Sequence, residues 1–322
     1  MTGVRAALRF LSLLRESPPT RPLSPAELVD LGRSHGCDFC WADFQRAFQI
    51  DWKMRAFRHS ANVPKPELVQ AYFDEMTPLL LEQFGSTYQA GLAVVDGKTD
   101  LAASHRFFAE RAGVRPGMRI LDAGCGLAGP ALEIAQTYPD VTIDAVTLSP
   151  VQAKAAKQQV DERGLSERVR VQRADYHKLP YADASFDLVL FLESMGYSPA
   201  SPLLFREVYR VLKPGATIYL KEPLLRHPPV NARQSAEVRA VFEKYRYKMH
   251  TGDEVCAQLQ AAGFTQVVYC DLSGQVSTRD FFESAMFASP GAATEFGAAH
   301  WIDFQELPVA YADIKARKES AP

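Results

Sequence analysis

The chain has 322 residues, of which 47% are hydrophobic and 23% are charged, and its formal net charge is −2. This size suits one large domain with an accessory, or two domains, and the balanced charge does not indicate nucleic acid or a membrane surface as the main partner. Its five cysteines are widely spaced, unlike a secreted disulfide framework. Because no apolar run approaches the roughly 18–20 residues of a membrane span and no signal-peptide cleavage site is evident, we expect a cytoplasmic protein. Homo-oligomerisation is left open.

Three short helices are predicted at the N-terminus. Apolar residues at helical spacing place the first over residues 3–16. The second begins with Ser24 as N-cap, Pro25 in the first helical position and Glu27 three residues after the cap. Residues 41–48 predict the third helix, and the prolines between the first two separate them.

Residues 1–60 are therefore expected to form a helical domain, joined through a linker at 59–67 to a larger domain over 61–322. Cys37 and Cys40 have the spacing of zinc ligands, but no second cysteine pair or paired histidines lie nearby. Two unrelated thiols are favoured, so no metal ligands are assigned.

The N-terminal segment resembles the small helical leader domain of natural-product peptide precursors of the nitrogen-fixation-associated and nitrile-hydratase-like type. The matching stretches are residues 7–14, residues 27–29, and the turn at 36–39 that precedes a helix. The resemblance implies an appended domain for docking or oligomerisation. A helical lid packed on the larger domain is the alternative.

The rest of the chain alternates strands with helices after two helices near residues 67–84 and 104–112. Strands are expected at 119–123, 141–147, 169–173, 188–192, 217–221, 266–270 and 309–315. Helices are expected at 130–137, from Ser149 onward, and at 203–212. This alternation predicts an α/β fold with a largely parallel sheet, helices on both faces, and a ligand at the carboxyl ends of the strands.

A glycine-rich loop follows the first of these strands. Asp122 precedes Gly124 and Gly126, and a helix then starts near Pro130. Glycines allow a tight turn and a close approach of ligand to backbone. The free N–H groups of the following helix point at that ligand. The loop therefore predicts a nucleotide-type ligand.

The acidic residues distinguish between two such ligands. A nicotinamide dinucleotide requires an acidic residue at the tip of the second strand, where Thr147 and Leu148 stand instead, and Asp144 is three residues too early. Asp122 suits a ligand that carries an ammonium and a sulfonium, which is S-adenosylmethionine. Asp175, followed by Tyr176, ends the third strand, where its carboxylate can accept from the adenine amino group.

Four stretches, in order, resemble class I S-adenosylmethionine-dependent methyltransferases over residues 100–322. They are residues 119–130, 172–176, 179–187 and 206–215. The resemblance implies the Rossmann-like, seven-stranded sheet of that family. A methyltransferase-like fold without activity is the alternative.

Residues 146–152 resemble the carbon-methylating branch, which contains cyclopropane fatty acid synthases and the sterol, tocopherol and prenyl diphosphate methyltransferases. In that branch the Thr and Gln of this motif hold the ribose. The resemblance places those roles on Thr147 and Gln152, with Leu148 between them in the cofactor site. Glu193 and Tyr197, after the fourth strand, match bacterial geranyl diphosphate C-methyltransferases.

An alkene acceptor would need a base, aromatic faces and exclusion of water, because its attack on the methyl group leaves a carbocation. Glu193 is the candidate base, with a capping or ligand-orienting role as the alternative. The candidate aromatic side chains, each of which could equally belong to the core, are Tyr197, Tyr72, Phe242 and Tyr245.

A diphosphate on the acceptor would need cations, and possible ligands follow in residues 241–250. This segment is expected to be an aromatic-rich helix that ends at His250, and Arg246 and Lys248 on it could bind phosphate oxygens. A solvated helix face is the alternative. Mg²⁺ could enter with the diphosphate.

The leading hypothesis is methyl transfer from S-adenosylmethionine to a carbon of an isoprenoid diphosphate such as isopentenyl, geranyl or farnesyl diphosphate. One alternative is an O-, N- or C-methyltransferase of another small natural product. Another is a tailoring module whose N-terminal domain recruits a carrier or peptide partner.

Overall fold

The computed structural model describes residues 2–16, 21, 23–47, 63–89, 91–277 and 307–320. At the N-terminus, α1 (Thr2–Glu16) and α2 (Pro25–Ser34) are followed by a short helix over 41–47. The predicted capping box is present, because the Ser24 hydroxyl accepts from the Glu27 N–H and the Glu27 carboxylate accepts from the Ser24 N–H. Phe48 and residues 59–62 of the expected linker lie outside the described residues.

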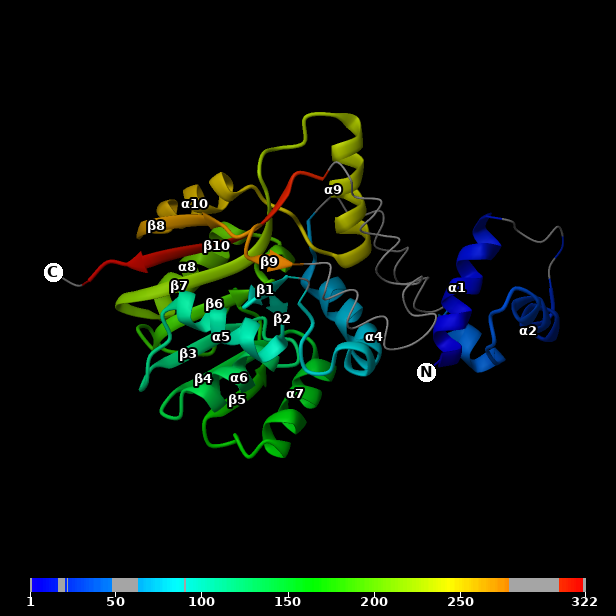
Figure 1. Ribbon diagram of the computed structural model, residues 1–322, viewed down its shortest axis with the longest axis horizontal. Coiled ribbons are helices and arrows are strands. Elements are labelled where there is room, and N and C mark those ends of the chain that lie inside the picture. The colour runs from blue at the N-terminus through cyan, green and yellow to red at the C-terminus, as the bar shows by residue number, and fades with distance from the viewer. Residues whose placement is uncertain are drawn as a thin grey trace.

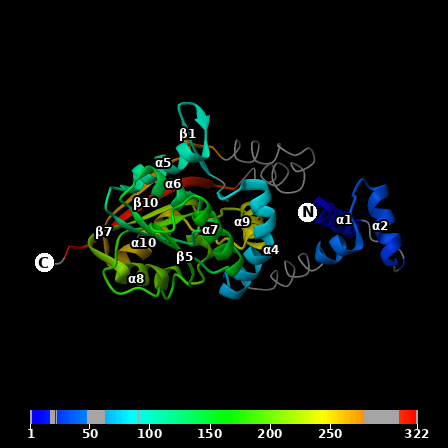
Figure 2. The same ribbon diagram turned by 90° about the horizontal axis from the view of Figure 1, so that it is seen from below.

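The N-terminal helices have an apolar cluster of their own. The ring of Phe10 lies 5.3 Å from that of Phe39 and 6.3 Å from that of Phe44. Figures 1 and 2 show α1 and α2 beside the α/β body, on the side where α4 lies. Arg5 of α1 approaches Glu82 of α4 at 3.9 Å. The division at residue 60 and the choice between an appended domain and a lid stay predictions.

The body contains a seven-stranded sheet in the order β5-β4-β3-β6-β7-β10-β8. Strands β5 to β7 are parallel, and β10 runs antiparallel to both β7 and β8. Each strand contains most of a predicted one. They are β3 (Arg119–Ala123), β4 (Thr142–Thr147), β5 (Val169–Arg173), β6 (Phe186–Leu192), β7 (Leu212–Leu225), β8 (Phe264–Asp271) and β10 (Val309–Lys318). The predicted α/β fold of the class I methyltransferase type is confirmed.

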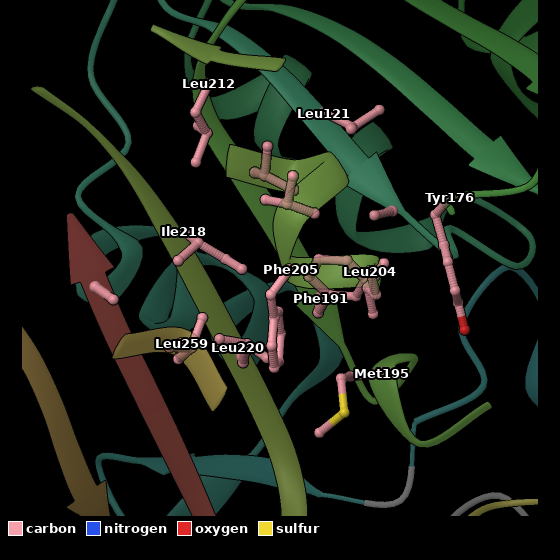
Figure 3. Close-up of a cluster of buried hydrophobic side chains, with 14 of the residues drawn as sticks. Leu121, Tyr176, Phe191, Met195, Leu204, Phe205, Leu212, Ile218, Leu220 and Leu259 are labelled. Carbon is pink, nitrogen blue, oxygen red and sulfur yellow. The ribbon is translucent and has the colours of Figure 1, made fainter. Parts of the chain in front are cut away.

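Helices cover both faces of this sheet and bury an apolar cluster on each. One cluster joins the sheet to α8 and α10, and Figure 3 shows Leu204, Phe205 and Leu259 packed against Phe191 and Leu220 of the strands. The opposite cluster includes α5, α6 and α7. These helices are α5 (Leu101–Ala112), α6 (Gly129–Thr137), α7 (Pro150–Glu162), α8 (Ser201–Val211) and α10 (Gly252–Ala261). Helices α6, α7 and α8 each connect two parallel strands, so the carboxyl ends of those strands lie at the same edge of the sheet.

Two more helices and a small sheet lie at the carboxyl end of the strands. Helices α4 (Pro66–Phe84) and α9 (Ala232–Tyr245) stand on the side nearest the N-terminal helices (Figures 1 and 2). Strands β2 (Lys98–Thr99), β1 (Leu92–Val95) and β9 (Val276–Ser277) form a three-stranded antiparallel sheet that the sequence did not predict. No helix in the described ranges is long and apolar enough to cross a membrane.

The expected helix over residues 241–250 is wrong at its end. Helix α9 stops at Tyr245, and Arg246 takes a left-handed conformation with φ of 61°. Beyond it the chain pairs with the short helix η2 (Met195–Tyr197), where the Lys248 N–H donates to the Gly196 carbonyl at 2.8 Å. A left-handed residue cannot continue a right-handed helix. The residues after Arg246 therefore face directions that a helical pattern does not predict.

Candidate active site

A solvent-open pocket lies at the carboxyl ends of β3, β4 and β6, and its empty space is about 1400 Å³ when the solvent at its mouth is included. One part of its wall consists of predicted cofactor residues: Gly124, Gly126, Thr147, Leu148, Gln152 and Tyr176. The other part is aromatic and comprises Phe73, Tyr88, Tyr197, Tyr245, Tyr247 and Tyr311. The cavity thus joins the glycine loop to an apolar chamber at the tip of the sheet.

The glycine loop is tightly packed against its neighbours. Gly124 has φ of 84°, and a Cβ there would lie 2.5 Å from Cβ of Ser194. The N–H groups of Gly124 and Cys125 both donate to the Val146 carbonyl at 2.9 Å. A side chain at Gly124 would therefore be strained and would displace the loop from β6. Because Gly124 has no side chain, the loop keeps this conformation and its backbone stays accessible to a ligand.

Asp122 is buried beneath this loop, with 2% of its surface exposed, and its Oδ2 makes no hydrogen bond. It does not itself line the cavity. Burial raises the pKa of its carboxyl to about 7, because the charged form loses hydration. An unsatisfied buried carboxylate is costly unless a donor or a cation approaches it. The ammonium and sulfonium of S-adenosylmethionine have the required charge, so the residues present fit this cofactor.

Thr147 and Gln152 lie together on the wall beside the loop. The Thr147 hydroxyl donates to Oε1 of Gln152 at 2.7 Å, and the Ser149 hydroxyl accepts from the Gln152 N–H at 3.0 Å. The N-cap at Ser149 that begins α7 therefore also fixes the position of Gln152. The ribose-binding role of the pair stays a prediction.

Asp175 is held away from the cavity wall. Its Oδ1 accepts from the His177 N–H at 2.8 Å and lies 2.7 Å from Nδ1 of His177. These contacts lower the pKa of the Asp175 carboxyl. The adjacent Tyr176 does line the cavity. The proposed contact between Asp175 and the adenine amino group stays a prediction.

The predicted substrate residues divide into two groups. Tyr197 and Tyr245 line the cavity, as expected for an acceptor wall. The described wall does not include the others, which are Tyr72, Phe242, Arg246, Lys248 and His250. Burial lowers the pKa of His250 to about 4, so its imidazole is neutral at neutral pH and cannot supply a positive charge to a phosphate. The substrate roles of these residues stay predictions.

Glu193 projects into the cavity from the end of β6 with a left-handed φ of 62°. Its Oε1 accepts from the Gly91 N–H at 3.0 Å and forms an ion pair with Lys221. Lys221 is fully buried, donates to the Gly91 carbonyl at 2.6 Å, and lies 4.9 Å from the ring centroid of Phe108. The Glu193 carboxylate therefore has a cation and a backbone donor as partners, and its role as the base stays a prediction. The sequence signal that could have revealed Lys221 is a lysine at the end of a buried strand.

Glu222, the next residue on β7, is a second carboxylate at the sheet tip that sequence reasoning missed. It is 1% exposed. Its Oε1 accepts from the N–H groups of Ser194 at 3.0 Å and Met195 at 2.8 Å, and its Oε2 accepts from the Tyr247 hydroxyl. Burial raises the pKa of Glu222 to about 8.

Comparisons with known proteins identify the family of this chain. Residues 120–215 match the family model described as a methyltransferase domain. The 27-O-demethylrifamycin SV methyltransferase of Amycolatopsis mediterranei is 32% identical over 203 residues, which are 62% of this chain and 74% of that protein. The chain therefore belongs to the class I S-adenosylmethionine-dependent methyltransferases and is an enzyme of that class.

Solved structures show the same fold. The [4+2]-cyclase SpnF is 28% identical, with a TM-score of 0.67 over 80% of this chain and 98% of that one. A geranyl diphosphate methyltransferase is 20% identical, with a TM-score of 0.65 over 81% of this chain and 99% of that one. The chain spans about half the length of two other relatives, methyltransferase phqN of Penicillium fellutanum (54%) and a sterol 24-C-methyltransferase of Gibberella zeae (46%).

Proposed function

We propose that this enzyme transfers the methyl group of S-adenosylmethionine to a carbon of an isoprenoid acceptor. The observation that carries the proposal is the wall of the acceptor chamber. Tyrosines, Phe73 and aliphatic side chains such as Val241, Met249 and Val309 make up most of it, and Glu193 is the charged side chain among the described wall residues. Such a wall suits an apolar ligand that a few polar groups orient.

The aromatic wall also suits the chemistry of an alkene. The π bond attacks the methyl carbon, the bond from sulfur to methyl breaks, and the positive charge moves from sulfur to a carbon of the acceptor. Tyr197 lies edge-to-face between Phe73 at 5.0 Å and Tyr247 at 5.2 Å, and all three rings line the chamber. Ring faces stabilise a cation, and apolar side chains around the cation offer no polar group to hold a water molecule beside it. A base must then remove a proton.

An isoprenoid acceptor can be a diphosphate or a neutral molecule, and the two differ in the charge that the chamber must bind. The sequence hypothesis names prenyl diphosphates, and a structure with the same fold is a geranyl diphosphate methyltransferase. In the part of the chain that the structure describes, however, no lysine or arginine lines the chamber. A diphosphate would therefore need Mg²⁺ or cations outside this wall. The described wall favours a neutral isoprenoid over its diphosphate.

The test is incubation with methyl-labelled S-adenosylmethionine and either geraniol or geranyl diphosphate, the latter with and without Mg²⁺. We expect the label on an acceptor carbon, located by NMR of the product, with geraniol turned over at the higher rate. Turnover of geranyl diphosphate alone, in a Mg²⁺-dependent manner, would restore the diphosphate hypothesis. Label on the geraniol oxygen would indicate the O-methyltransferase alternative, and absence of label from both acceptors would contradict the proposed function.

A further inference from the structure

We propose that Tyr247 is the catalytic residue that takes the proton from the acceptor and that Glu222 is the positioning residue that receives the proton of Tyr247. This inference rests on the proposed function, because it concerns the deprotonation that completes the methyl transfer. Sequence reasoning assigned that step to Glu193. The contacts of the two carboxylates at the sheet tip favour the pair formed by Tyr247 and Glu222 instead.

The position of Tyr247 is determined by close packing. Its ring lies on the backbone of Gly196, where a Cβ would come within 2.3 Å of the Tyr247 ring, and meets the ring of Tyr197 edge-on at 5.2 Å. The ring lines the acceptor chamber, and its hydroxyl donates to Oε2 of Glu222. The hydroxyl therefore joins the chamber on one side to a buried carboxylate on the other.

The two carboxylates differ in what surrounds them. Oε1 of Glu193 contacts the buried ammonium of Lys221 and accepts from the Gly91 N–H at 3.0 Å. Glu222 instead accepts from neutral groups, the N–H groups of Ser194 and Met195 and the Tyr247 hydroxyl. Through the Tyr247 hydroxyl, Oε2 of Glu222 is connected to a side chain that lines the chamber, whereas Oε1 of Glu193 is occupied by a cation.

The other titratable groups around Glu222 do not replace it as the base. Its surroundings include Glu193 and four tyrosines, which are Tyr176, Tyr197, Tyr247 and Tyr311. Burial raises the pKa of each of these tyrosines well above its ordinary range, so they stay neutral hydroxyls. The negative charge of Glu193 adds to burial in raising the pKa of Glu222 to about 8. Deprotonated Glu222 is thus available near and above that pH.

The proton transfer involves three groups, which are the cationic acceptor, Tyr247 and Glu222. After the methyl carbon bonds to the acceptor and the sulfur keeps its electron pair as S-adenosylhomocysteine, the cationic acceptor carries one excess proton. That proton moves to the Tyr247 oxygen while the Tyr247 hydroxyl proton moves to Oε2 of Glu222. Tyr247 ends neutral, Glu222 ends as the carboxylic acid, and the acceptor regains a double bond. Glu222 later returns its proton to solvent.

The experiment compares Tyr247→Phe and Glu222→Gln with the wild-type enzyme over pH 6 to 9. Tyr219→Phe is the matched control, because the buried Tyr219 hydroxyl also donates to a carboxylate, Asp313 at 2.9 Å, away from the cavity wall. The acceptor is geraniol or geranyl diphosphate, whichever the wild-type enzyme methylates. Binding of S-adenosylhomocysteine by calorimetry identifies variants that have lost the fold.

We expect kcat of the wild type to rise about tenfold per pH unit below about 8 and then level. Tyr247→Phe should lose about 100-fold or more in kcat while it keeps cofactor binding. In Glu222→Gln, kcat should no longer rise with pH below about 8. In Glu193→Gln, kcat should still rise with pH below about 8, and the Tyr219→Phe control should resemble the wild type. The inference would be overturned if kcat of Tyr247→Phe or Glu222→Gln rose with pH as in the wild type, or if kcat of Glu193→Gln no longer rose with pH.

Infrared difference spectroscopy makes the inference testable without turnover. The protonated carboxyl band of Glu222 should disappear around pH 8 and be absent from Glu222→Gln at every pH. A Glu222 that stays ionised down to pH 6 would contradict the inference even if no acceptor is methylated. Failure of the proposed function would instead show as absence of label transfer with the infrared titration intact.

Discussion

Asn in place of Asp122 separates the energetic cost of a buried carboxylate from its benefit to cofactor binding. Burial raises the pKa of Asp122 from an ordinary 3.8 to about 7, a difference of about three pH units. At 1.36 kcal/mol per unit, keeping this carboxylate charged in the folded, cofactor-free enzyme costs about 4 kcal/mol. Because the pKa of Asp122 is higher in the folded state than in the unfolded state, protonation of its carboxyl favours folding. The full stability is therefore present below pH 3.8, and about 4 kcal/mol of it is lost as the pH rises to about 7.

Asp122→Asn should therefore be more stable than the wild type at pH 8, by up to about 4 kcal/mol, and the difference should shrink as pH falls toward 4. The free energy of unfolding, extrapolated from urea titrations at pH 4 to 8, measures this. Glu222 also loses protonation in this range, so the comparison concerns the difference between the two proteins and not the slope of either. Equal pH dependence in wild type and variant would refute the assignment of the raised pKa to Asp122.

The same substitution should weaken the binding of S-adenosylmethionine. Loss of a charged partner costs about 1.5–3 kcal/mol, which corresponds to roughly 10- to 150-fold in affinity. Because the cofactor's positive charge favours ionised Asp122, the wild type should release protons when it binds the cofactor below pH 7. Calorimetry in two buffers of different ionisation enthalpy detects this release. Affinity and proton release that match in both proteins would show that Asp122 does not face the cofactor's charge.

Two further substitutions test contacts at the sheet tip. Lys221→Met leaves the Glu193 carboxylate without its buried ammonium and should cost about 3–5 kcal/mol of stability. Adding Glu193→Gln to that variant should recover part of the loss in urea titrations, and no recovery would argue against the ion pair as the cause. Thr147→Val removes the hydroxyl that donates to Gln152. Loss of this hydrogen bond should weaken cofactor binding by about 1 kcal/mol, which raises KM for S-adenosylmethionine about fivefold with little change in Tm. The matched surface variant Thr137→Val should leave KM unchanged, and an equal effect in both would contradict the role of Thr147.

Local signals in the sequence determined the framework of this protein. Alternation of apolar strands and helices predicted all seven strands of the main sheet, because each strand or helix carries its own periodicity. The N-cap at Ser149 and the glycines at 124 and 126 were also visible, since capping and left-handed turns depend on neighbouring residues. Asp122 stood out because an acid before this loop selects a positively charged ligand.

Only the tertiary structure decided the electrostatics of the acceptor chamber. Glu193 meets Lys221 and Gly91, and Glu222 meets Tyr247, across 25 to 102 residues of sequence. The helical pattern before His250 could not predict these contacts, because the chain turns at Arg246 and returns along η2. A side chain's charge and basicity depend on the groups that surround it after folding. Sequence therefore predicted the cofactor and the fold, while the partners of each carboxylate emerged only when distant strands packed together.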